Sequence, residues 1–468
     1  MPDDLAFASV AELGRRLRAR KVSATELATH FLDRLESLGP TFGAVVTVTR
    51  GRALIEAAAA DREIARGRWR GPLHGIPYGV KDLLAAEGYP TSWGAAPYEN
   101  QLFAADATVV ARLKAAGAVL VAKLAMVELA GGMGYNQANA SFTGPGRTPW
   151  NPDYWSGGSS SGPGAAVAAG LVPFAIGSET SGSIVTPAAY SGVTGLRPTY
   201  GLVSRHGAMA LSWTMDKLGP MGRSAEDCAL VLAAIAGKDP EDPSSVDRGF
   251  RVPLATRPRR KLRIGILKNA DQGIQAEVAK NFRDALGVLK DVITVTENVE
   301  LPDLPYGVVG GTIIAVEGAS AFDDLVDSGR VAQLTAPEDR IGGYAALAIP
   351  ARDYVRALRL RRPMGKALDA LLKQFDAIAT PTRGTVASPI DKPFRDAWPG
   401  VTGGANIIGP ANVVGVPSIS VPNGFGVQNL PTGLCFTARA FEEGTLVQLG
   451  RLYQTRTDWH KQRPPVTA

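Results

Sequence analysis

The sequence predicts a single large α/β domain that spans residues 1–468. Segments with helical periodicity alternate along the chain with short apolar segments of strand character, which is typical of α/β architecture. The 468 residues are 45% hydrophobic and 20% charged, so the chain can bury a substantial core. No internal repeat or low-complexity segment divides it. We distinguish an N-terminal helical region (1–70), a motif-rich core (71–210) and the remainder of the same domain (211–468).

The chain is expected to begin with a helical hairpin. Serine and glutamate recur three residues apart in Ser9-x-x-Glu12 and Ser23-x-x-Glu26, the pattern of a capping box at a helix N-terminus. After the second box, one face of the expected helix carries Leu27, Phe31, Leu35 and Leu38.

Strands and helices then alternate. Residues 75–82, GIPYGVKD, predict a short strand, and a helix with Asp106 as its N-cap is expected to end near residue 116 and to lead into a strand over 119–122. Later elements are expected at residues 351–375 (helix), 376–382 (apolar segment), 415–422 (strand bounded by prolines) and 442–457 (helix).

Two irregular segments interrupt this alternation. Residues 131–164 are rich in Gly, Asn, Ser and Pro, and so long a loop inside a compact domain is usually functional. Residues 238–244 begin a polar, proline-rich crossing to a strand near residue 262. The basic run from Arg257 to Arg263 lies in this crossing, and a solvated linker is favoured over a binding patch.

Charge and cysteine content exclude several classes. The formal net charge, 50 − 44 = +6, is spread along the sequence and is too weak to argue for nucleic acid. Cys228 and Cys435 lie among apolar neighbours and are expected to be buried free thiols in a reducing compartment.

The start at Asp3 and Asp4 does not fit a signal peptide. The longest apolar stretch, 165–176, is shorter than the ~20 residues of a membrane helix. We expect a cytoplasmic protein with no membrane or nucleic-acid partner.

Hydroxyl groups crowd the segment 177–187, GSETSGSIVTP, and raise the question of a serine nucleophile. Of the four histidines, only His74 and His206 are placed to act as a base, and each also fits a loop or hydrogen-bonding role. The remaining candidate base is Lys81, at the end of the apolar strand 75–82, where burial would lower its pKa. A surface lysine paired with Asp82 is the alternative for this segment alone.

No cofactor or metal is expected. The glycine-rich segment 157–164 lacks the Gly-Lys-Ser/Thr ending of a phosphate-binding loop and the spacing of a dinucleotide fingerprint. The sequence also holds no His, Cys and carboxylate cluster with metal-ligand spacing.

Three segments together resemble the amidase signature family: GIPYGVKD (75–82), GGSSSGPGAAVAAG (157–170) and the segment 177–207. The resemblance covers nearly the whole chain. It implies a single α/β/α domain with a central mixed β-sheet covered by helices, and a Ser-cisSer-Lys triad. In this sequence Ser183 matches the nucleophile, Ser159 the bridging serine after a cis peptide bond, and Lys81 the base. The two serines are 183 − 159 = 24 positions apart, as in that family.

The segment Thr180–Ser183 is expected to form the oxyanion hole. Small residues at Thr180, Ser181 and Gly182 let successive backbone N–H groups turn toward one point beside Ser183. A helix suggested by residues 184–190 would place its positive end there. The other hydroxyls of the segment, including that of Ser178, are expected to serve as turn and cap groups.

Substrate-contacting walls are expected from the loop at residues 126–135. The candidates are Met126, Met133, Tyr135 and Trp155, with Trp93 as a further one, although core packing explains each equally well.

The family's usual element reads Asp-Thr-Gly-Gly-Ser-Ile-Arg, whereas Ser181 and Val185 stand here in place of a glycine and the arginine. The added side chain at Ser181 is expected to narrow the oxyanion turn slightly. A site without the arginine is expected to be less polar.

The resemblance therefore implies an amidase that acts through an acyl-enzyme on a small-molecule amide. We favour aryl or bulky apolar amides, with carbamates (urethanes) and esters as further substrates, in a monomer or homodimer. The alternative is the A subunit of a glutamine-dependent tRNA amidotransferase, which works inside a complex. A catalytically inactive scaffold fits poorly with an intact Lys81, Ser159 and Ser183.

Overall fold

The computed structural model describes residues 5–254 and 260–465. Asp3, Asp4 and the first part of the basic run, Arg257 to Arg259, lie outside the described residues. Of that run, Arg260 forms two hydrogen bonds of 2.6 Å with the Asp376 carboxylate, as part of an exposed ion pair.

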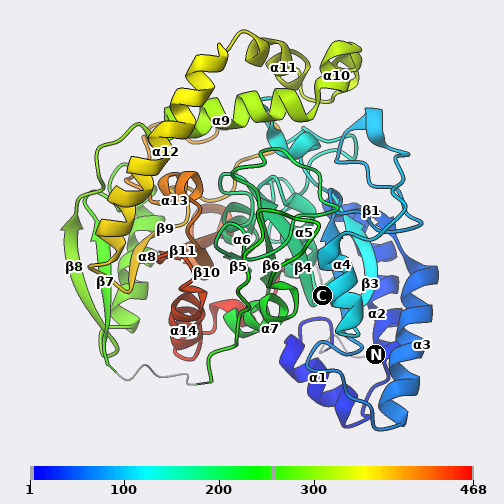
Figure 1. Ribbon diagram of the computed structural model, residues 1–468. Helices are drawn as coiled ribbons and strands as arrows, with labels where there is room; N and C mark the ends of the chain where they lie inside the picture. The colour runs from blue at the N-terminus through cyan, green and yellow to red at the C-terminus, as the bar shows by residue number, and fades with distance from the viewer. Residues whose placement is uncertain (1–4, 255–259, 466–468) are drawn as a thin grey trace.

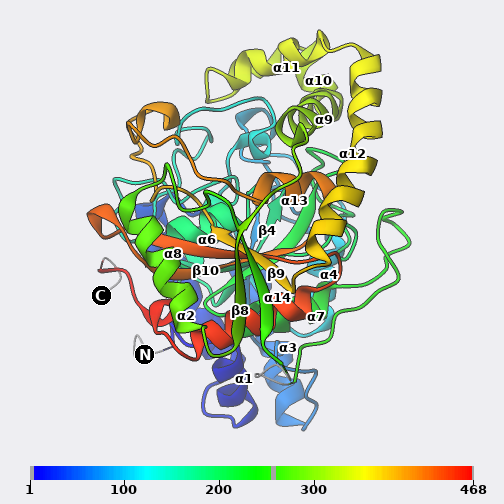
Figure 2. The ribbon, with the colours of Figure 1, turned by 90° about the vertical axis from the view of Figure 1, so that its left-hand side faces the viewer.

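The centre of the protein is a mixed β-sheet, and the described residues contribute eleven strands to it (Figures 1 and 2). Their order across the sheet is β1-β3-β2-β4-β6-β5-β10-β11-β9-β7-β8. The strands are β1 (Val45–Val48), β2 (Pro77–Lys81), β3 (Val119–Leu124), β4 (Phe174–Glu179), β5 (Thr194–Arg197), β6 (Lys217–Gly222), β7 (Leu262–Leu267), β8 (Ile293–Val299), β9 (Ala377–Pro381), β10 (Ser418–Phe425) and β11 (Pro431–Thr437). The expected α/β fold with a central mixed sheet is confirmed.

Helices cover both faces of this sheet. They are α1 (Val10–Arg18), α2 (Ala24–Leu38), α3 (Arg50–Ala65), α4 (Thr108–Ala115), α5 (Ser161–Ala168), α6 (Val185–Ser191), α7 (Ala225–Ile235), α8 (Ala276–Val288), α9 (Tyr306–Ala321), α10 (Asp323–Asp327), α11 (Asp339–Leu347), α12 (Ala351–Leu372), α13 (Ile408–Val414) and α14 (Glu443–Gln454). On β10, Ser420 faces the side of α6, whereas Ile419 and Val421 face α14. Figure 1 shows α9 to α12 forming an arch above the sheet.

The sheet brings the key motifs to one edge. β2 lies between β3 and β4 and runs parallel to both. Because the carboxyl ends of parallel strands meet at the same edge of a sheet, Lys81 at the end of β2 and Glu179 at the end of β4 lie on the same side. The long segment 132–160 lies between the 3-10 helix η3 (Glu128–Gly131) and α5 and contains no helix or sheet strand.

The N-terminal caps follow the prediction only in part. Ser23 and Glu26 form the complete capping box, since each side chain accepts from the other's backbone N–H. Ser9 caps α1 through the Glu12 N–H, but the Glu12 carboxylate pairs with Arg16 instead of completing a box.

The prediction that Asp106 caps a helix is wrong. Helix α4 begins at Thr108, after Ala107, and has no side-chain cap. The Asp106 carboxylate instead binds the Arg52 guanidinium through two hydrogen bonds of 2.7 and 2.8 Å. A two-bond pair between opposite charges is stronger than a single capping bond to a backbone N–H, so Asp106 binds Arg52 instead of capping α4.

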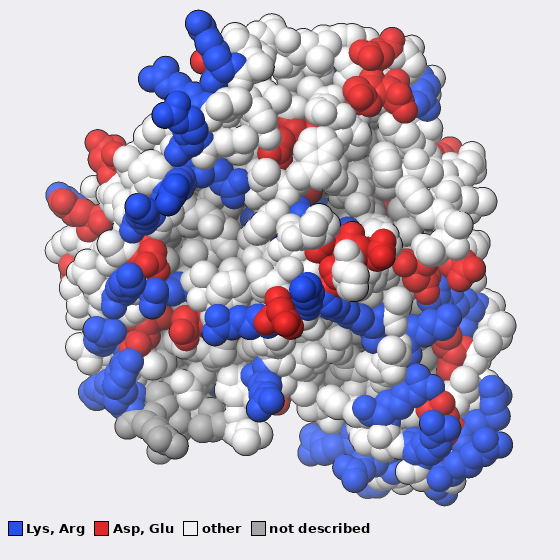
Figure 3. Space-filling model, in the orientation of Figure 1, with Lys and Arg blue, Asp and Glu red and all other residues white. Residues whose placement is uncertain are grey.

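Charge is less evenly distributed than the sequence suggests. Figure 3 shows Lys and Arg side chains gathered at the lower right, where Figure 1 places α1 to α3. Folding gathers these charges because it brings the end of α1 against the end of α3. Arg20, just after α1, donates to the carbonyl oxygens of Ile64 and Ala65 at 3.2 and 2.9 Å.

Cys228 and Cys435 are buried and free, as expected. Among the described residues, the helices include none that combines the length and apolar character needed to cross a membrane.

The capping boxes give a first prediction. Ser23→Ala should lower the free energy of unfolding by about 1 kcal/mol, because it removes one hydrogen bond and leaves its Glu26 partner without a reciprocal contact. Ser9→Ala should cost less, since its box is incomplete. Urea unfolding followed by circular dichroism measures both changes, and an equal loss in the two variants would contradict the assignment.

Candidate active site

Lys81 is the buried centre of the site. It is fully buried, and its Nζ donates to Ser159 Oγ at 2.7 Å and to Ser178 Oγ at 2.9 Å. Burial lowers the pKa of Lys81 to about 7, and the more distant carboxylates of Asp216 and Glu179 offset only part of this effect. A large share of Lys81 is therefore neutral near pH 7 and able to accept a proton.

The alternative of a surface Lys81 paired with Asp82 does not fit the structure. Asp82 is fully buried, and its carboxylate pairs with Lys123 of β3 at 2.8 Å. The other Asp82 oxygen accepts from the backbone N–H and hydroxyl of Ser92. Asp82 thus neutralises a different lysine.

Ser159 follows a cis peptide bond from Gly158. It is 1% exposed, and its carbonyl oxygen accepts from the Val127 N–H at 3.1 Å. A Cβ on Gly158 would lie 2.5 Å from Trp155 and 2.8 Å from the Val127 side chain, so the backbone can pass here only as glycine.

Residues 180–184 join β4 to α6, and we call them the nucleophile loop. Gly182 has a φ of +97°, a conformation that favours glycine. Ser183 is partly exposed, and its carbonyl oxygen accepts from the Ser160 N–H at 3.3 Å. This contact brings the nucleophile loop against the segment that carries Ser159.

The two departures from the family pattern lie away from the turn's interior. The Ser181 side chain is exposed, so it gives no sign of narrowing the turn. Val185 is fully buried in a small apolar cluster with Ile408 and Cys435. Helix α6 begins at Val185, two residues beyond Ser183, and is seven residues long.

The two predicted methionine walls lie in the core. Met126 is fully buried and packs closely against Gly94. A Cβ added to Gly94 would lie 2.6 Å from the Met126 carbonyl oxygen and 3.1 Å from its Cγ. Met133 is 4% exposed and packs against α11 at Gly342 and Gly343.

Tyr135 and Trp155 belong to one aromatic cluster. Their rings are 6.2 Å apart, and Trp155 stacks on Phe394 at 4.4 Å. Because Trp155 also contacts Gly158, this cluster borders the residue before Ser159. Trp93 lies apart from it, against Tyr98 at 4.6 Å.

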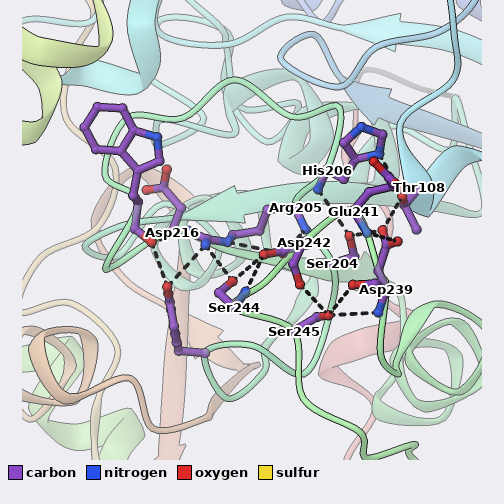
Figure 4. Close-up of polar contacts among 12 residues, drawn as sticks. Thr108, Ser204, Arg205, His206, Asp216, Asp239, Glu241, Asp242, Ser244 and Ser245 are labelled. Carbon is purple, nitrogen blue, oxygen red and sulfur yellow. Dashed lines mark hydrogen bonds and ion pairs between the residues drawn. The ribbon is translucent and has the colours of Figure 1, made fainter.

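A cavity of about 520 Å³ lies beside this site and is lined by Ser178 and Thr180, but Lys81, Ser159 and Ser183 are not among its lining residues. The other lining residues include the buried Leu83, Ala130, Met209, Leu211 and Asp216 and the more exposed Tyr200, Arg205 and Trp213. Figure 4 shows the polar part of this lining, where Arg205 lies beside Asp242 and Ser244. None of the four predicted wall residues, Met126, Met133, Tyr135 and Trp155, is among its lining residues.

Within the described residues, neither candidate histidine forms a hydrogen bond with Ser159, Ser178 or Ser183. His74 is buried, its Nδ1 accepts from the Arg70 N–H at 3.2 Å, and burial lowers its pKa. His206 Nδ1 lies 3.3 Å from Thr108 Oγ1 on the cavity wall. In the described part of the chain, no group of three His, Cys, Asp or Glu residues is arranged to hold a metal ion.

Sequence reasoning missed Ser178. Its hydroxyl was expected to be a turn or cap group, whereas it accepts from Lys81, and Ser178 also lines the cavity. The available signal was its place at the end of an apolar strand, because that strand is β4, the parallel neighbour of β2.

Comparison with known proteins identifies the family to which this chain belongs. The family profile described as Amidase matches residues 26–447. The chain belongs to the amidase signature family. Among relatives of this amidase, the A subunit of the glutamyl-tRNA(Gln) amidotransferase of Aromatoleum aromaticum is 38% identical, with 98% of this chain and 99% of that protein covered.

Solved structures agree with the family assignment. The amidase superposes with a TM-score of 0.88 and 31% identity on a chain of a vestigial protein complex related to the origins of an s-triazine catabolic enzyme, covering 96% of this chain and 98% of that one. It also superposes on the native peptide amidase from Stenotrophomonas maltophilia with a TM-score of 0.85 and 34% identity, covering 99% of both chains.

The Ser178 contact gives a second prediction. Ser178→Ala removes an acceptor that favours the ammonium over the amine, so the pKa of Lys81 should fall further and the acidic limb of the rate profile should move to lower pH. The maximal rate should drop about tenfold, since a hydrogen bond to a charged group contributes ~1.5–3 kcal/mol. Ser178→Thr keeps the hydroxyl and should keep the wild-type profile. A profile unchanged in Ser178→Ala would contradict this role.

Proposed function

We propose that this amidase cleaves amide C–N bonds through an acyl-enzyme on Ser183, activated by Lys81 through Ser159. The observation that carries the proposal is the 2.7 Å contact between Lys81 Nζ and Ser159 Oγ in a fully buried setting. Lys81 is buried and has neutral hydroxyl partners, so it is suited to accept a proton. The segment that carries Ser159 contacts the turn on which the partly exposed Ser183 lies.

The proton movements balance in two half-reactions. Neutral Lys81 accepts the proton of Ser159, Ser159 accepts that of Ser183, and Ser183 Oγ bonds to the carbonyl carbon of the amide. When the C–N bond breaks, the same relay returns a proton to the leaving amine. Water then repeats the attack on the ester and releases the acid.

The oxyanion is assigned to the backbone N–H groups of Thr180, Ser181, Gly182 and Ser183. The left-handed Gly182 turns the chain sharply at this point, which supports a convergence of successive N–H groups. The positive end of α6 adds little, because the helix is short and begins beyond Ser183.

For the substrate, the relatives favour the alternative, an amidotransferase component, over the aryl or carbamate preference. The Aromatoleum relative is the A subunit of such an enzyme and matches over almost its whole length, and a second, from an Azoarcus species, is 39% identical. On this proposal the amide is that of glutamine, and the chain works with partner subunits rather than as a monomer or homodimer.

A free-standing amidase is the second candidate. The cavity that reaches Ser178 and Thr180 has apolar side chains on its wall, among them Met209, Leu211 and Trp213, which suit an aryl or bulky apolar amide, carbamate or ester. The likeness to peptide amidase, which covers 99% of this chain, also supports it.

Substrate assays separate these candidates. On the first proposal, ammonia release from glutamine should appear or rise at least tenfold when the partner subunits are added. On the second, the purified chain alone should hydrolyse anilides or carbamates, with no gain from partners. If glutamine is not hydrolysed in the presence of the partner subunits, the first proposal is rejected. If the purified chain alone hydrolyses no anilide or carbamate, the second is rejected.

Substitution of the proposed triad gives a third prediction. Ser183→Ala and Lys81→Ala should each lower turnover at least ~10³-fold, and Ser159→Ala should be severe as well. Ser160→Ala should be milder, because the two hydrogen bonds of its hydroxyl join the backbone of Ser178, at 3.2 and 3.3 Å. The measurement is kcat of the wild type and of each variant on the best wild-type substrate. Full activity of Lys81→Ala would reject the relay.

The pKa of Lys81 gives a fourth prediction. Since this pKa is lowered to about 7, the neutral, competent form is lost as pH falls, and kcat/KM should drop about tenfold per pH unit below 6. The rate should level off above pH ~8. His74→Ala and His206→Ala serve as controls that should keep this profile. Loss of activity in either control to the level of Ser183→Ala would point to a histidine base.

A further inference from the structure

Polar side chains that the proposed reaction does not use hold the nucleophile loop from within the protein. Glu179, the last residue of β4, accepts from the N–H groups of Ile184 and Val185 at 2.8 and 3.0 Å. These two amides directly follow Ser183. The other Glu179 oxygen accepts from Arg197 at 2.7 Å and from Asn412 at 2.8 Å. Glu179 therefore fixes the chain where it leaves the loop.

Thr180, where the chain enters the loop, is held from two directions. Its hydroxyl donates to Asp216 Oδ1 at 2.6 Å, and its carbonyl oxygen accepts from Lys217 Nζ at 3.4 Å. Lys217 is the first residue of β6 and lies opposite Glu179 in the β4–β6 pairing. Side chains of successive residues in an extended chain point to opposite sides, so Asp216 and Lys217 reach Thr180 as a clamp.

Both clamp residues are themselves fixed. Asp216 Oδ2 accepts from the N–H groups of Leu211 and Ser212, each at 2.9 Å. Lys217 Nζ donates to Asn412 Oδ1 at 2.9 Å, and Asn412 donates in turn to Glu179. The entry and the exit of the nucleophile loop are thus connected through one side chain, that of Asn412.

Burial makes this network costly. Lys217 is 2% exposed and Asp216 7%, while Glu179 and Arg197 are fully buried. Burial lowers the pKa of Lys217 and raises that of Asp216, the directions expected when charge is poorly solvated. Apolar side chains of similar volume often stabilise a core as well as buried ion pairs do. Stability alone therefore does not account for the clamp.

We propose that Asp216 and Lys217 are positioning residues that hold Thr180 so that the N–H groups of the nucleophile loop stay aimed at the developing oxyanion. This inference rests on the proposed function, in which Ser183 attacks a carbonyl carbon. Oxyanion stabilisation depends on donors that are oriented before reaction, and loss of one donor costs ~10²–10³-fold in kcat. A donor that is retained but released from its clamp should cost less, about tenfold or more.

Three substitutions test the clamp by kinetics. Thr180→Val removes the hydroxyl at nearly constant volume, Thr180→Ser retains it, and Lys217→Met removes the amine. Thr180→Val and Lys217→Met should lower kcat at least about tenfold, with KM within about threefold, whereas Thr180→Ser should retain most of kcat. A rise in KM with kcat unchanged would overturn the proposal.

The matched control is Asp227→Asn. Asp227 is a fully buried carboxylate of α7 that accepts from the N–H groups of Val10 and Ser224, away from the nucleophile loop. Its substitution should lower thermal stability without changing kcat. A kcat loss equal to that of Lys217→Met would mean that any damage to a buried polar group lowers the rate, and would overturn the proposal.

Hydrogen exchange measured by mass spectrometry provides a readout independent of activity. The peptide covering residues 179–186 should exchange faster in Thr180→Val and Lys217→Met than in the wild type, and at the wild-type rate in Asp227→Asn. Unchanged exchange in both clamp variants would overturn the proposal even if Ser183→Ala is inactive. If Ser183→Ala stays active, the proposed function fails and exchange alone decides the clamp. Should Lys217→Met not fold, the Thr180→Val and Thr180→Ser pair decides.

Discussion

The removal of Lys81 from water is the constraint on which the site depends. A lysine with its ordinary pKa of 10.5 is neutral in only about one molecule in 3,000 at pH 7, whereas a pKa of about 7 makes about half of the molecules neutral. The fold achieves this by ending β2 inside the protein, between two parallel strands that are themselves fully buried. The large sheet is therefore part of the chemistry, because it supplies the low dielectric that shifts the lysine.

Burial also dictates which partners Lys81 can have. Lys81 and Lys123 lie on neighbouring strands, and both are fully buried. Lys123 meets the Asp82 carboxylate at 2.8 Å, which favours its charged form, whereas Lys81 meets the hydroxyls of Ser159 and Ser178. A carboxylate at the same distance from Lys81 would raise its pKa again and remove the base. The pairing of Asp82 with Lys123 thus keeps the charge of Asp82 away from Lys81, the base of the proposed relay.

Sequence reasoning succeeded where the signal is local and failed where it depends on distant partners. The strand that carries Lys81, the capping box at Ser23 and the family motifs are readable within a few residues. Asp106 is read wrongly, because its partner Arg52 lies 54 residues away. The clamp on Thr180 was invisible for the same reason, since Asp216 lies 36 residues away and Asn412 is 195 residues from Lys217. Met126 shows a different limit: an apolar residue beside a motif fits a wall or a core equally well, and only the fold decides.

Substrate choice has to be made outside the buried network. Relatives of this amidase include a peptide amidase and a component of an amidotransferase, so closely similar folds accompany different activities. Lys81, Glu179 and the proposed clamp are each fixed by buried hydrogen bonds, and in the proposed mechanism a change at any of them would disturb the chemistry along with the specificity. Among the residues that line the cavity, Trp213 is less constrained. Trp213 is 45% exposed, and its carbonyl oxygen is held by Arg205, which also binds Ser244 of the neighbouring loop at 2.6 Å. Arg205 thus fixes the backbone at Trp213 while the Trp213 side chain stays exposed, so on the proposal of a free-standing amidase a substitution of this side chain could change substrate choice without disturbing Lys81 or the proposed clamp.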